Sequence, residues 1–588
     1  MSLHRIAWPA PAVLAAALFA PAVPAAEPPA PSPVEELRQA LLQQPGPDGV
    51  DAYKTGLRKR LDALNSVGGL AEVLGFDLWP AEAVQPRQEQ ESEPIRFTRE
   101  FHLLVRQKLF KQIRKAFTTG DAATQAAAAI LLGSTAAAER EQRMKTGAIG
   151  FGPNQQPREP FAELGADLIT LMKAEDAAVR RAAVRALVEV GSEPEQTVAA
   201  VGRLLDSTEK DPSVRRAAAA ALEKLLDSAG RQNAAMFGSD PKAEAGFIRL
   251  ESQAVPAAAL GLADGDEAVR RRCLAALRRI LNALTDLTRN PWRPGFSNGF
   301  NDPQQQLAVL EQAREKSRLV LSLAGAANKV LPAVARALED DKADAAVAAA
   351  AVLESAATAR IGVRRWDDAL SQEKLGDAKP SADPLPALLG ARPSLAKNLS
   401  RPEIRVRLAA VYVLEALGPD AAPASETLAK ALGEDADAFV RWGAARALGK
   451  MAPGQSRDAV PALAKALADK SADVRLTAAV ALRRFGPTAK EAVAALAAAV
   501  KRDDGARLEA LKTLAVVGAE AGPAAKESAV AAAVALADPD PEVRVAAAHA
   551  LAHVGPADED SRKALRKALD DPDDAVRGAA AAALLSGK

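Results

Sequence analysis

A short pattern returns along the chain at a nearly constant interval, and this repetition constrains the fold more than any other feature. The copies lie at 176–187, 211–222, 266–277, 403–414, 437–448, 471–482, 540–551 and 573–584, with a weaker one at 504–514. The motif arginines at 407, 441, 475, 507, 544 and 577 are 34, 34, 32, 37 and 33 residues apart. A period of this length predicts stacked structural units rather than one closed core.

The pattern D-x-x-V-R-x-x-A-x-x-A-L has the signals of a helix with one buried face. Its leading Asp suits a helix start, and Pro often follows, as in Asp211-Pro212, Asp540-Pro541 and Asp571-Pro572. A seam of small and branched apolar residues then follows the helical period: Val440, Ala444, Ala447, Leu448 and Met451. Many copies end on Gly, which readily adopts a left-handed conformation and stops a helix: Gly191, Gly418, Gly486, Gly518 and Gly555.

A second helix is expected before each motif, for example at 460–468 and 491–500. One helix pair cannot bury its apolar face alone, but a stack of pairs buries a continuous one. Aromatic residues are only 4% of a chain that is 48% hydrophobic, so Ala, Leu and Val fill the interior and allow close helix packing. The sequence therefore predicts an all-α solenoid, a superhelical stack of antiparallel helix pairs.

The paired helices, the period and the D-x-x-V-R-x-x-A-x-x-A-L pattern resemble HEAT repeats, most closely the bacterial type called phycobilisome-lyase HEAT-like. This resemblance implies a HEAT-repeat α-solenoid but no single function, because scaffolds, adaptors, chromophore lyases and hydroxylases share the architecture. Hydroxylases of this kind hold two irons with repeated His-Glu pairs. The chain has four histidines and none precedes Glu, so we exclude that reaction. The lyase branch has no short signature to compare.

No residue set predicts a catalytic, cofactor or metal site. His549 and His553 stand one turn apart, but no third ligand has suitable spacing, so we interpret them as exposed histidines outside the seam. The single cysteine, Cys273, occupies a position where other copies have Ala and is interpreted as a small buried side chain. We therefore expect a protein that is not an enzyme and has no cofactor.

The N-terminus has the pattern of a secretory signal peptide. A short basic start precedes an apolar run interrupted by prolines, and small residues at Val23–Ala26 suit cleavage after Ala25 or Ala26. The alternative is a retained anchor, which the prolines and the short length disfavour. We expect no later membrane span, because the Ala-rich runs at 122–138 and 344–360 are short and contain polar residues. The prediction is an exported protein, periplasmic or extracellular, with no stable membrane anchor.

Charge argues against general nucleic-acid binding. The chain has 76 basic and 75 acidic side chains, and removing residues 1–26 removes one Arg and no acid, which leaves 75 of each. Binding to phosphate requires a basic surplus or a basic face. We therefore expect a protein partner and no nucleic acid.

The motif arginines are expected to bridge to the acidic cap of a neighbouring repeat, because every repeat demands them. Residues that differ between copies are better candidates for recognition. Trp442 follows the motif Arg at a position where other copies have Arg, Leu, Val or Gly. It is interpreted either as an interface anchor or as a half-buried side chain that covers a neighbouring helix.

Three interruptions divide the stack. Between Arg270 and Arg407 the copies are degenerate, and 287–303 has Trp292, Phe296 and Phe300 among Pro, Gly and Asn, which predicts a long loop that either binds a partner or covers the solenoid. Residues 143–160 and 366–386 are expected to be plain loops. The resulting division is a signal peptide at 1–26, a Pro-rich linker and N-terminal helical cap at 27–94, HEAT repeats at 95–280, degenerate repeats with loop insertions at 281–398, and regular HEAT repeats at 399–588.

The sequence as a whole favours an exported scaffold or adaptor that presents a groove to a protein, with Trp292, Phe296, Phe300 and Trp442 as candidate partner-binding residues. The alternative is an enzyme accessory or chromophore-lyase-like protein that binds a small ligand in the concave groove. A closed pocket with convergent polar groups would favour this alternative, and an open groove would favour the scaffold.

Overall fold

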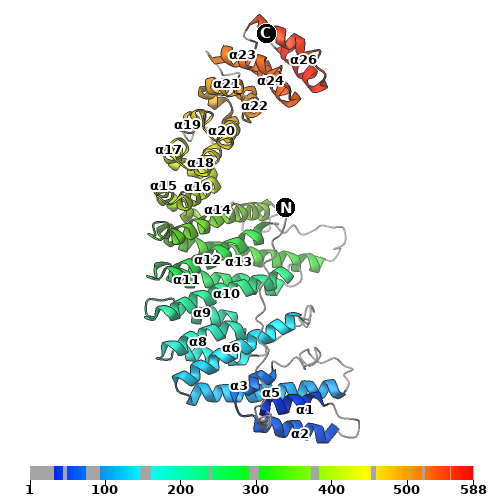
Figure 1. The fold of residues 1–588 in the computed structure, drawn as a ribbon, viewed down its shortest axis with the longest axis vertical. Helices are drawn as coiled ribbons and strands as arrows, with labels where there is room; N and C mark the ends of the chain where they lie inside the picture. The colour runs from blue at the N-terminus through cyan, green and yellow to red at the C-terminus, as the bar shows by residue number, and fades with distance from the viewer. Residues whose placement is uncertain are drawn as a thin grey trace, which may run out of the picture. The chain divides into compact units, whose positions relative to one another are not determined.

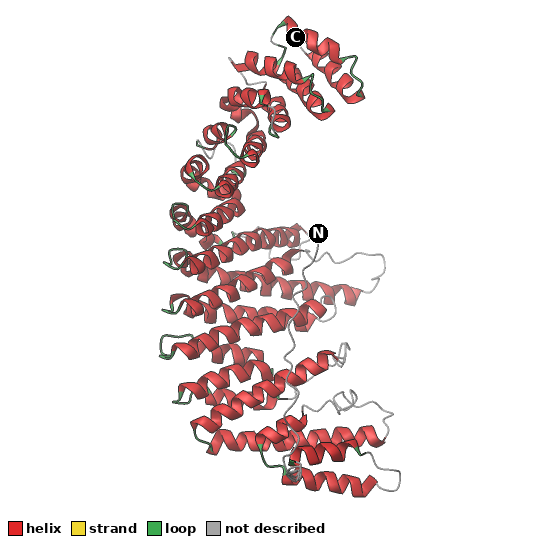
Figure 2. Cartoon of the chain, in the orientation of Figure 1, coloured by secondary structure: helices red, strands yellow, loops and turns green. Residues whose placement is uncertain are grey.

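The chain is described by a computed structural model. It covers residues 32–43, 50–74, 93–145, 161–191, 193–236, 241–289, 303–372, 383–451, 458–502, 505–518, 524–556 and 558–586. Within these residues the regular structure is helical and no strand occurs (Figure 2). The chain divides into two compact units, residues 1–112 and 113–588.

The first unit contains α1 (Pro33–Leu42), α2 (Val50–Ala63), α3 (Val67–Leu74) and most of α5 (Glu93–Thr119). Helix α1 packs against both α2 and α3. Lys108 of α5 donates to the carbonyl oxygens of Leu61 and Asp62 at the end of α2, at 2.7 and 2.9 Å, which fixes α5 to this helical group.

The second unit is two layers of helices (Figure 1). The inner series begins with α6 (Ala122–Lys145) and continues with the helices that carry the repeated pattern, here called motif helices: α8 (Ala177–Val190), α10 (Pro212–Met236), α12 (Glu267–Arg289), α14 (Ala343–Gln372), α16 (Ile404–Leu417), α18 (Ala438–Gly449), α20 (Ala472–Phe485), α22 (Arg507–Val517), α24 (Pro541–Val554) and α26 (Asp574–Ser586). Each packs against the next motif helix along the chain.

The second layer contains the helix that precedes each motif helix: α7 (Gly165–Leu171), α9 (Pro194–Arg203), α11 (Pro241–Leu260), α13 (Pro303–Ala337), α15 (Arg392–Asn398), α17 (Ser425–Glu434), α19 (Ala459–Ala466), α21 (Val493–Lys501), α23 (Ala525–Ala535) and α25 (Glu559–Ala568). Short 3₁₀ turns connect some pairs: η2 (Ala162–Leu164), η3 (Gly261–Ala263), η4 (Pro386–Ala391), η5 (Gly418–Ala424) and η6 (Gly486–Ala492). Each helix of this layer contacts the motif helix that follows it, which confirms the predicted all-α solenoid.

The predicted helix signals have mixed outcomes. Asp176 and Asp437 accept hydrogen bonds from the backbone N–H groups of the first turn, as expected of N-caps. Gly191, Gly418, Gly486 and Gly555 have positive φ, as predicted. The prediction for Gly518 is wrong: its φ is −62°, and its role is close packing, because a β-carbon there would lie 2.3 Å from Cγ2 of Val554.

The central helices are longer than those of the regular repeats. Helices α10, α12, α13 and α14 have 25, 23, 35 and 30 residues, whereas the motif helices from α16 to α24 have 11 to 14. The expected loop at 366–386 therefore begins later, because 366–372 are the last residues of α14.

Among the described residues, two helices are long and apolar enough to cross a membrane, 314–337 and 343–366, contrary to the expectation for 344–360. Both pack within the stack, and buried core helices meet the same criterion.

The motif arginines join consecutive repeats through one recurring geometry. In six of them, Nε and Nη2 donate to the two carboxylate oxygens of an acid in the next repeat, at 2.6–3.2 Å. The pairs are Arg180–Glu209, Arg215–Asp264, Arg270–Asp340, Arg407–Asp435, Arg441–Asp469 and Arg544–Asp571. Paired planar groups of this kind are among the stronger polar contacts in proteins. We call the series the arginine ladder.

The partner acid is not the helix cap, which corrects the expectation. Asp435 pairs with Arg407, whereas the N-cap of α18 is Asp437, two residues later. The backbone carbonyl of Asp435 also accepts a hydrogen bond from Nη1 of Arg441 at 2.9 Å. Five of the six ladder acids thus bind the preceding arginine with the side chain and the following motif arginine with the backbone carbonyl; Asp340 is the exception. Asp571 likewise pairs with Arg544 rather than starting α26, whose first turn is capped by Asp573.

In one repeat the arginine comes from the following repeat instead of from the motif helix, and we call this contact the reversed rung of the arginine ladder. In α14 the position of the motif arginine is occupied by Ala346, six residues after the ladder acid Asp340. Arg401, at the ladder-acid position of the next repeat, donates to the carbonyls of Asp340 and Asp341 at 3.1 and 3.5 Å. It also pairs with Glu403 at 3.1 Å. The cation thus comes from the following repeat, and the two carbonyls that a motif arginine normally binds are still satisfied.

We expect replacement of a ladder arginine to weaken the stack even when the charge is kept. Arg441 is 3% exposed and makes four hydrogen bonds, two to Asp469 and two to backbone carbonyls. Arg441→Lys keeps the charge but loses the planar fork, which should cost about 1–3 kcal/mol of unfolding free energy. Arg441→Ala leaves Asp469 buried without its partner and should cost about 3–5 kcal/mol. Urea titration followed by circular dichroism measures both. The exposed Arg484→Lys is the control, and an equal loss there would contradict this assignment.

The ladder should also make stability fall in acid. Burial acts to raise the pKa of Asp469, but hydrogen bonds from Arg441 and the Ser471 N–H outweigh it, so the pKa lies below its usual value. An acid whose pKa is lower in the folded than in the unfolded protein stabilises the fold above the unfolded-state pKa, about 4, and loses this contribution as pH falls through the folded value. Urea midpoints at pH 7 and pH 3 should therefore differ less in Arg441→Met/Asp469→Asn than in the wild type. An unchanged difference would contradict the prediction.

Candidate functional site

Trp442 lies on the solvent-facing side of α18, and its side chain is half-buried. The guanidinium carbon of Arg446, one turn later, stands 4.6 Å from the ring centroid, which is cation–π geometry. Phe439, one turn earlier, is 67% exposed. The stripe of α18 that faces solvent therefore begins with two aromatic side chains.

The neighbouring motif helices also carry apolar side chains on their solvent-facing stripes, at the position of Trp442 (Leu408, Leu476 and Leu508) or one turn later (Tyr412 and Val480). Tyr412 of α16 and Leu476 of α20 are each 37% exposed. Leu408, Val480 and Leu508 are half-buried at the corresponding positions of α16, α20 and α22. We call these residues, with Phe439 and Trp442, the apolar band: Leu408, Tyr412, Phe439, Trp442, Leu476, Val480 and Leu508. Grouped exposed apolar side chains mark interaction sites more often than isolated ones do.

Close helix contacts fix the register of this band. A β-carbon at Gly443 of α18 would lie 2.6 Å from Cγ1 of Val411, so the two helices approach closely beside Trp442. Arg446 pairs with Glu415 of α16 at 2.6 Å. Residues of α18 thus stand level with residues of α16 that are 31 or 32 positions earlier, which places Trp442 within about one turn of both Leu408 and Tyr412 along neighbouring axes. Between α18 and α20, a β-carbon at Gly449 would lie 2.6 Å from that of Ala481.

Basic side chains follow the apolar residues on the same helices. Arg446 and Lys450 lie in the second half of α18 and at its end, Arg483 and Arg484 near the end of α20, and Lys512 in the middle of α22. We call these five residues the basic band. Their side chains are 38–40% exposed where they form ion pairs, and Arg484 is exposed. On α18, α20 and α22 the cations of the basic band thus follow the apolar side chains along the helix.

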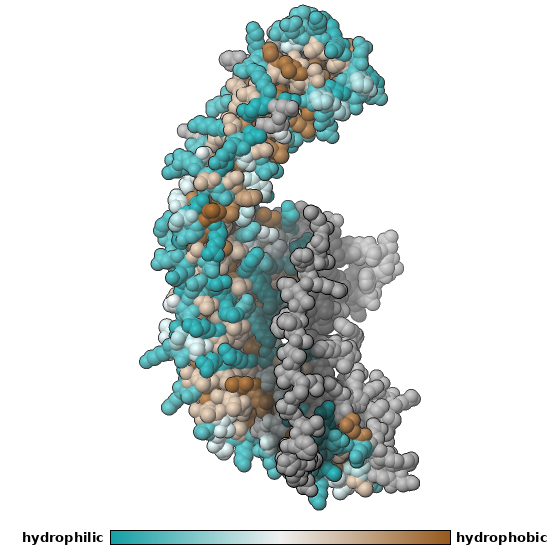
Figure 3. Space-filling model, in the orientation of Figure 1, coloured by the Kyte–Doolittle hydropathy of each residue, from teal (hydrophilic) through white to brown (hydrophobic). Residues whose placement is uncertain are grey.

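The first half of the chain has a different surface. At the position of Trp442, helices α8, α10 and α12 have Arg181, Arg216 and Arg271. Arg216 pairs with Asp266, and Arg271 approaches Asp344 at 3.5 Å. The apolar band is therefore a property of α16 to α22. The sequence singled out Trp442 but missed Phe439, Tyr412 and Leu476, although these residues occupy solvent-facing positions of three consecutive motif helices. In Figure 3 the described surface is mostly hydrophilic, with hydrophobic side chains in patches.

Trp292, Phe296 and Phe300 lie outside the described residues, so their predicted role stays a prediction. In the sequence they stand between α12 and α13, two of the long central helices.

The other sequence candidates do not form a chemical site. The thiol of Cys273 is fully buried, and burial raises its pKa to about 12, as expected of a packing residue. His549 and His553 are exposed, and Nδ1 of His553 lies 3.0 Å from the carbonyl of His549. In the described part of the chain, no group of three or more His, Cys, Asp or Glu side chains is placed to hold a metal ion.

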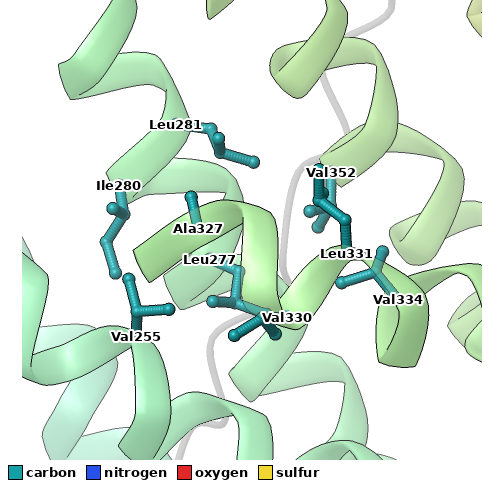
Figure 4. A pocket seen from close by; sticks show the side chains of 9 residues that line it. All are labelled: Val255, Leu277, Ile280, Leu281, Ala327, Val330, Leu331, Val334 and Val352. Atoms are coloured by element: carbon teal, nitrogen blue, oxygen red, sulfur yellow. The ribbon is translucent and has the colours of Figure 1, made fainter. Parts of the chain in front are cut away.

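Two buried titratable groups stand apart from the surface. Burial and Arg106 lower the pKa of His102 to about 3, so its ring is neutral. Glu251 of α11 is 1% exposed, and burial raises its pKa well above the usual value. One turn later, Val255 lines a small cavity between α11, α12, α13 and α14 (Figure 4). The walls of this cavity are aliphatic side chains only, so it has no polar group to orient a ligand.

Comparison with known proteins agrees with this architecture. Residues 165–241, 392–483 and 506–585 match the family model described as HEAT repeats. No curated protein sequence matches the chain. Solved structures with some likeness include an engineered protein, with 20% identity, a TM-score of 0.41, and coverage of 81% of this chain and 98% of that one.

Two further structures contain a karyopherin and a designed armadillo repeat protein. The karyopherin Kap121p bound to the SUMO protease Ulp1p has 13% identity and a TM-score of 0.33, and the match covers 94% of this chain and 56% of that one. A designed armadillo repeat protein in complex with the peptide (KR)4 has 16% identity and a TM-score of 0.28, with coverage of 52% and 98%.

The family match falls on both sides of the degenerate region, and the helix pairs continue through that region from α11 to α14. The three matched segments are similar to HEAT repeats, and the second unit of the chain is an all-α solenoid of stacked helix pairs.

Proposed function

We propose that this protein is an exported bacterial scaffold or adaptor of the phycobilisome-lyase HEAT-like type, which binds a protein partner and is not an enzyme. The observation that carries the proposal is the apolar band, where Phe439, Tyr412 and Leu476 are exposed beside Trp442 on consecutive motif helices. Aromatic side chains grouped on a rigid surface are the usual anchors of protein interfaces.

The rigidity of this surface supports the proposal. The helices that carry the band are joined by the ladder pairs Arg407–Asp435 and Arg441–Asp469, and by the close approaches at Gly443 and Gly449. A preformed surface loses less conformational entropy when it binds a partner. The alternative, a small-ligand or chromophore-lyase-like accessory, would need a pocket with convergent polar groups. The aliphatic cavity beside α11 does not have that character.

Export is the second part of the proposal and rests on residues 1–26. We expect a protein produced in a bacterial host to be recovered outside the cytoplasm without its first 25 or 26 residues. Intact-mass measurement of periplasmic and cytoplasmic fractions tests this. Full-length protein in the membrane fraction would instead indicate a retained anchor.

The binding function is tested by affinity capture from an envelope extract with four forms of the protein. The band variant carries Tyr412→Ala, Phe439→Ala, Trp442→Ala and Leu476→Ala. The loop variant carries Trp292→Ala, Phe296→Ala and Phe300→Ala. The control carries Leu260→Ala, Val530→Ala, Val534→Ala and Leu569→Ala, which are also exposed apolar residues but lie elsewhere. We expect the wild type and the control to retain a stoichiometric protein partner, and the band variant to lose it with its helicity unchanged.

Loss of the partner in the loop variant alone would move the binding surface to 287–303. Equal retention by all four forms would contradict both surfaces. If no form retains a protein and a small molecule copurifies instead, the scaffold function is wrong and the ligand-binding alternative replaces it.

A further inference from the structure

The basic band contains more cations than the acids beside it can pair. Glu415 receives both Arg446 and Lys450, at 2.6 and 2.8 Å. Glu509 receives both Arg483 and Lys512, at 2.9 and 3.0 Å. Arg484 is exposed and has no ion pair among the described residues. Glu415, Glu509 and the exposed Asp473 of α20 thus face five cations, which leaves a local excess of two positive charges next to the apolar band.

This excess exists although the whole chain is close to neutral, with a formal charge of +1. Several acids of the same repeats are bound elsewhere. Asp435 and Asp469 pair with ladder arginines, and Asp538 pairs with Arg507, in the turns between helices. Asp437 and Asp540 cap helix N-termini. The exposed Asp473 of α20 remains on the solvent-facing stripe, where the cations still outnumber the acids.

We propose that the occupant of this face is an acidic amphipathic segment of the partner protein, a deduction that rests on the proposed protein-binding function. Its apolar side would cover Trp442, Tyr412 and Leu476, and its carboxylates would meet the adjacent basic band. In the protein alone, two cations share Glu415 and two share Glu509. A carboxylate of the bound segment would form a separate ion pair with one cation of each set. Charge complementarity of this kind accelerates association and selects against basic partners.

Arg446 lies at the boundary of the two bands. Its guanidinium packs on the Trp442 ring at 4.6 Å and donates to Glu415 at 2.6 Å, so it contacts both an apolar anchor and an acid. A segment with an apolar side chain next to a carboxylate matches this boundary. A nucleic acid would use the cations but has little use for the apolar residues, which is why a protein segment fits better.

The test is selection of a random peptide display library by the full-length protein, followed by anisotropy titration of the enriched peptides. The basic-band variant carries Lys450→Gln, Arg484→Gln and Lys512→Gln. The charge-matched control carries Lys430→Gln, Lys465→Gln and Lys526→Gln, exposed lysines on the preceding helices α17, α19 and α23. We expect enriched peptides with an acidic excess and spaced apolar residues. Their affinity should fall at least tenfold in the basic-band variant, less than twofold in the control, and steeply with added salt.

Enrichment of neutral or basic peptides, no enrichment, or equal affinity for the two variants would overturn the acidic occupant. A labelled double-stranded DNA that binds as tightly as the enriched peptides would overturn it in favour of a nucleic-acid surface. These outcomes are separable from failure of the proposed function: if envelope capture still depends on Tyr412, Phe439, Trp442 and Leu476, the scaffold stands and only the acidic character of its partner is wrong.

Discussion

The structure of the second unit depends on the arginine ladder, in which six motif arginines each form a bidentate pair with an acid in the next repeat. Asp435 shows why the pairing couples more than two helices, because its carboxylate holds Arg407 while its backbone carbonyl holds Arg441. Its carboxylate also accepts from the N–H of Asp437, the cap of α18. One residue thus fixes the previous repeat, the turn and the next helix. Small seam residues allow the close approach of helices that brings these groups within reach.

The same pairing decides which charges remain for other uses. Ladder and cap acids are held in the turns, so the solvent-facing stripe of α16 to α22 is left with a basic excess beside its apolar residues. Overall charge did not reveal this, because total charge says nothing about how acids and bases divide between turns and helix faces. The neutral composition argues against a general affinity for nucleic acid, but it does not describe the local surface around Trp442.

Much of the fold follows from local sequence rules. The helix caps Asp176 and Asp437 and the helix-ending Gly191 could be predicted from the sequence. The conformation of each is set by contacts within its own helix. The predictions that were wrong concern residues whose role depends on another repeat. Asp571 has the local sequence of a helix cap, but its carboxylate pairs with Arg544. Gly518 was expected to end a helix with a left-handed conformation, but it packs closely against the side chain of Val554. The site was predicted in part, since Trp442 differs visibly from its equivalents, whereas its neighbours Tyr412 and Leu476 form a surface only when the helices are stacked.

The reversed rung shows that the geometry of the ladder matters more than the position of its arginine in the sequence. Ala346 and Arg401 are 55 positions apart, and neither fits the repeated pattern alone. Arg401 nevertheless supplies a guanidinium to the carbonyls of Asp340 and Asp341, and Glu403 supplies the carboxylate. The carbonyls of Asp340 and Asp341 thus accept hydrogen bonds from the following repeat instead of from an arginine of their own repeat. Stacking from α12 through α14 to α16 continues here, although the repeat pattern is no longer recognisable, and Arg401 supplies the donor that a motif arginine provides in other repeats.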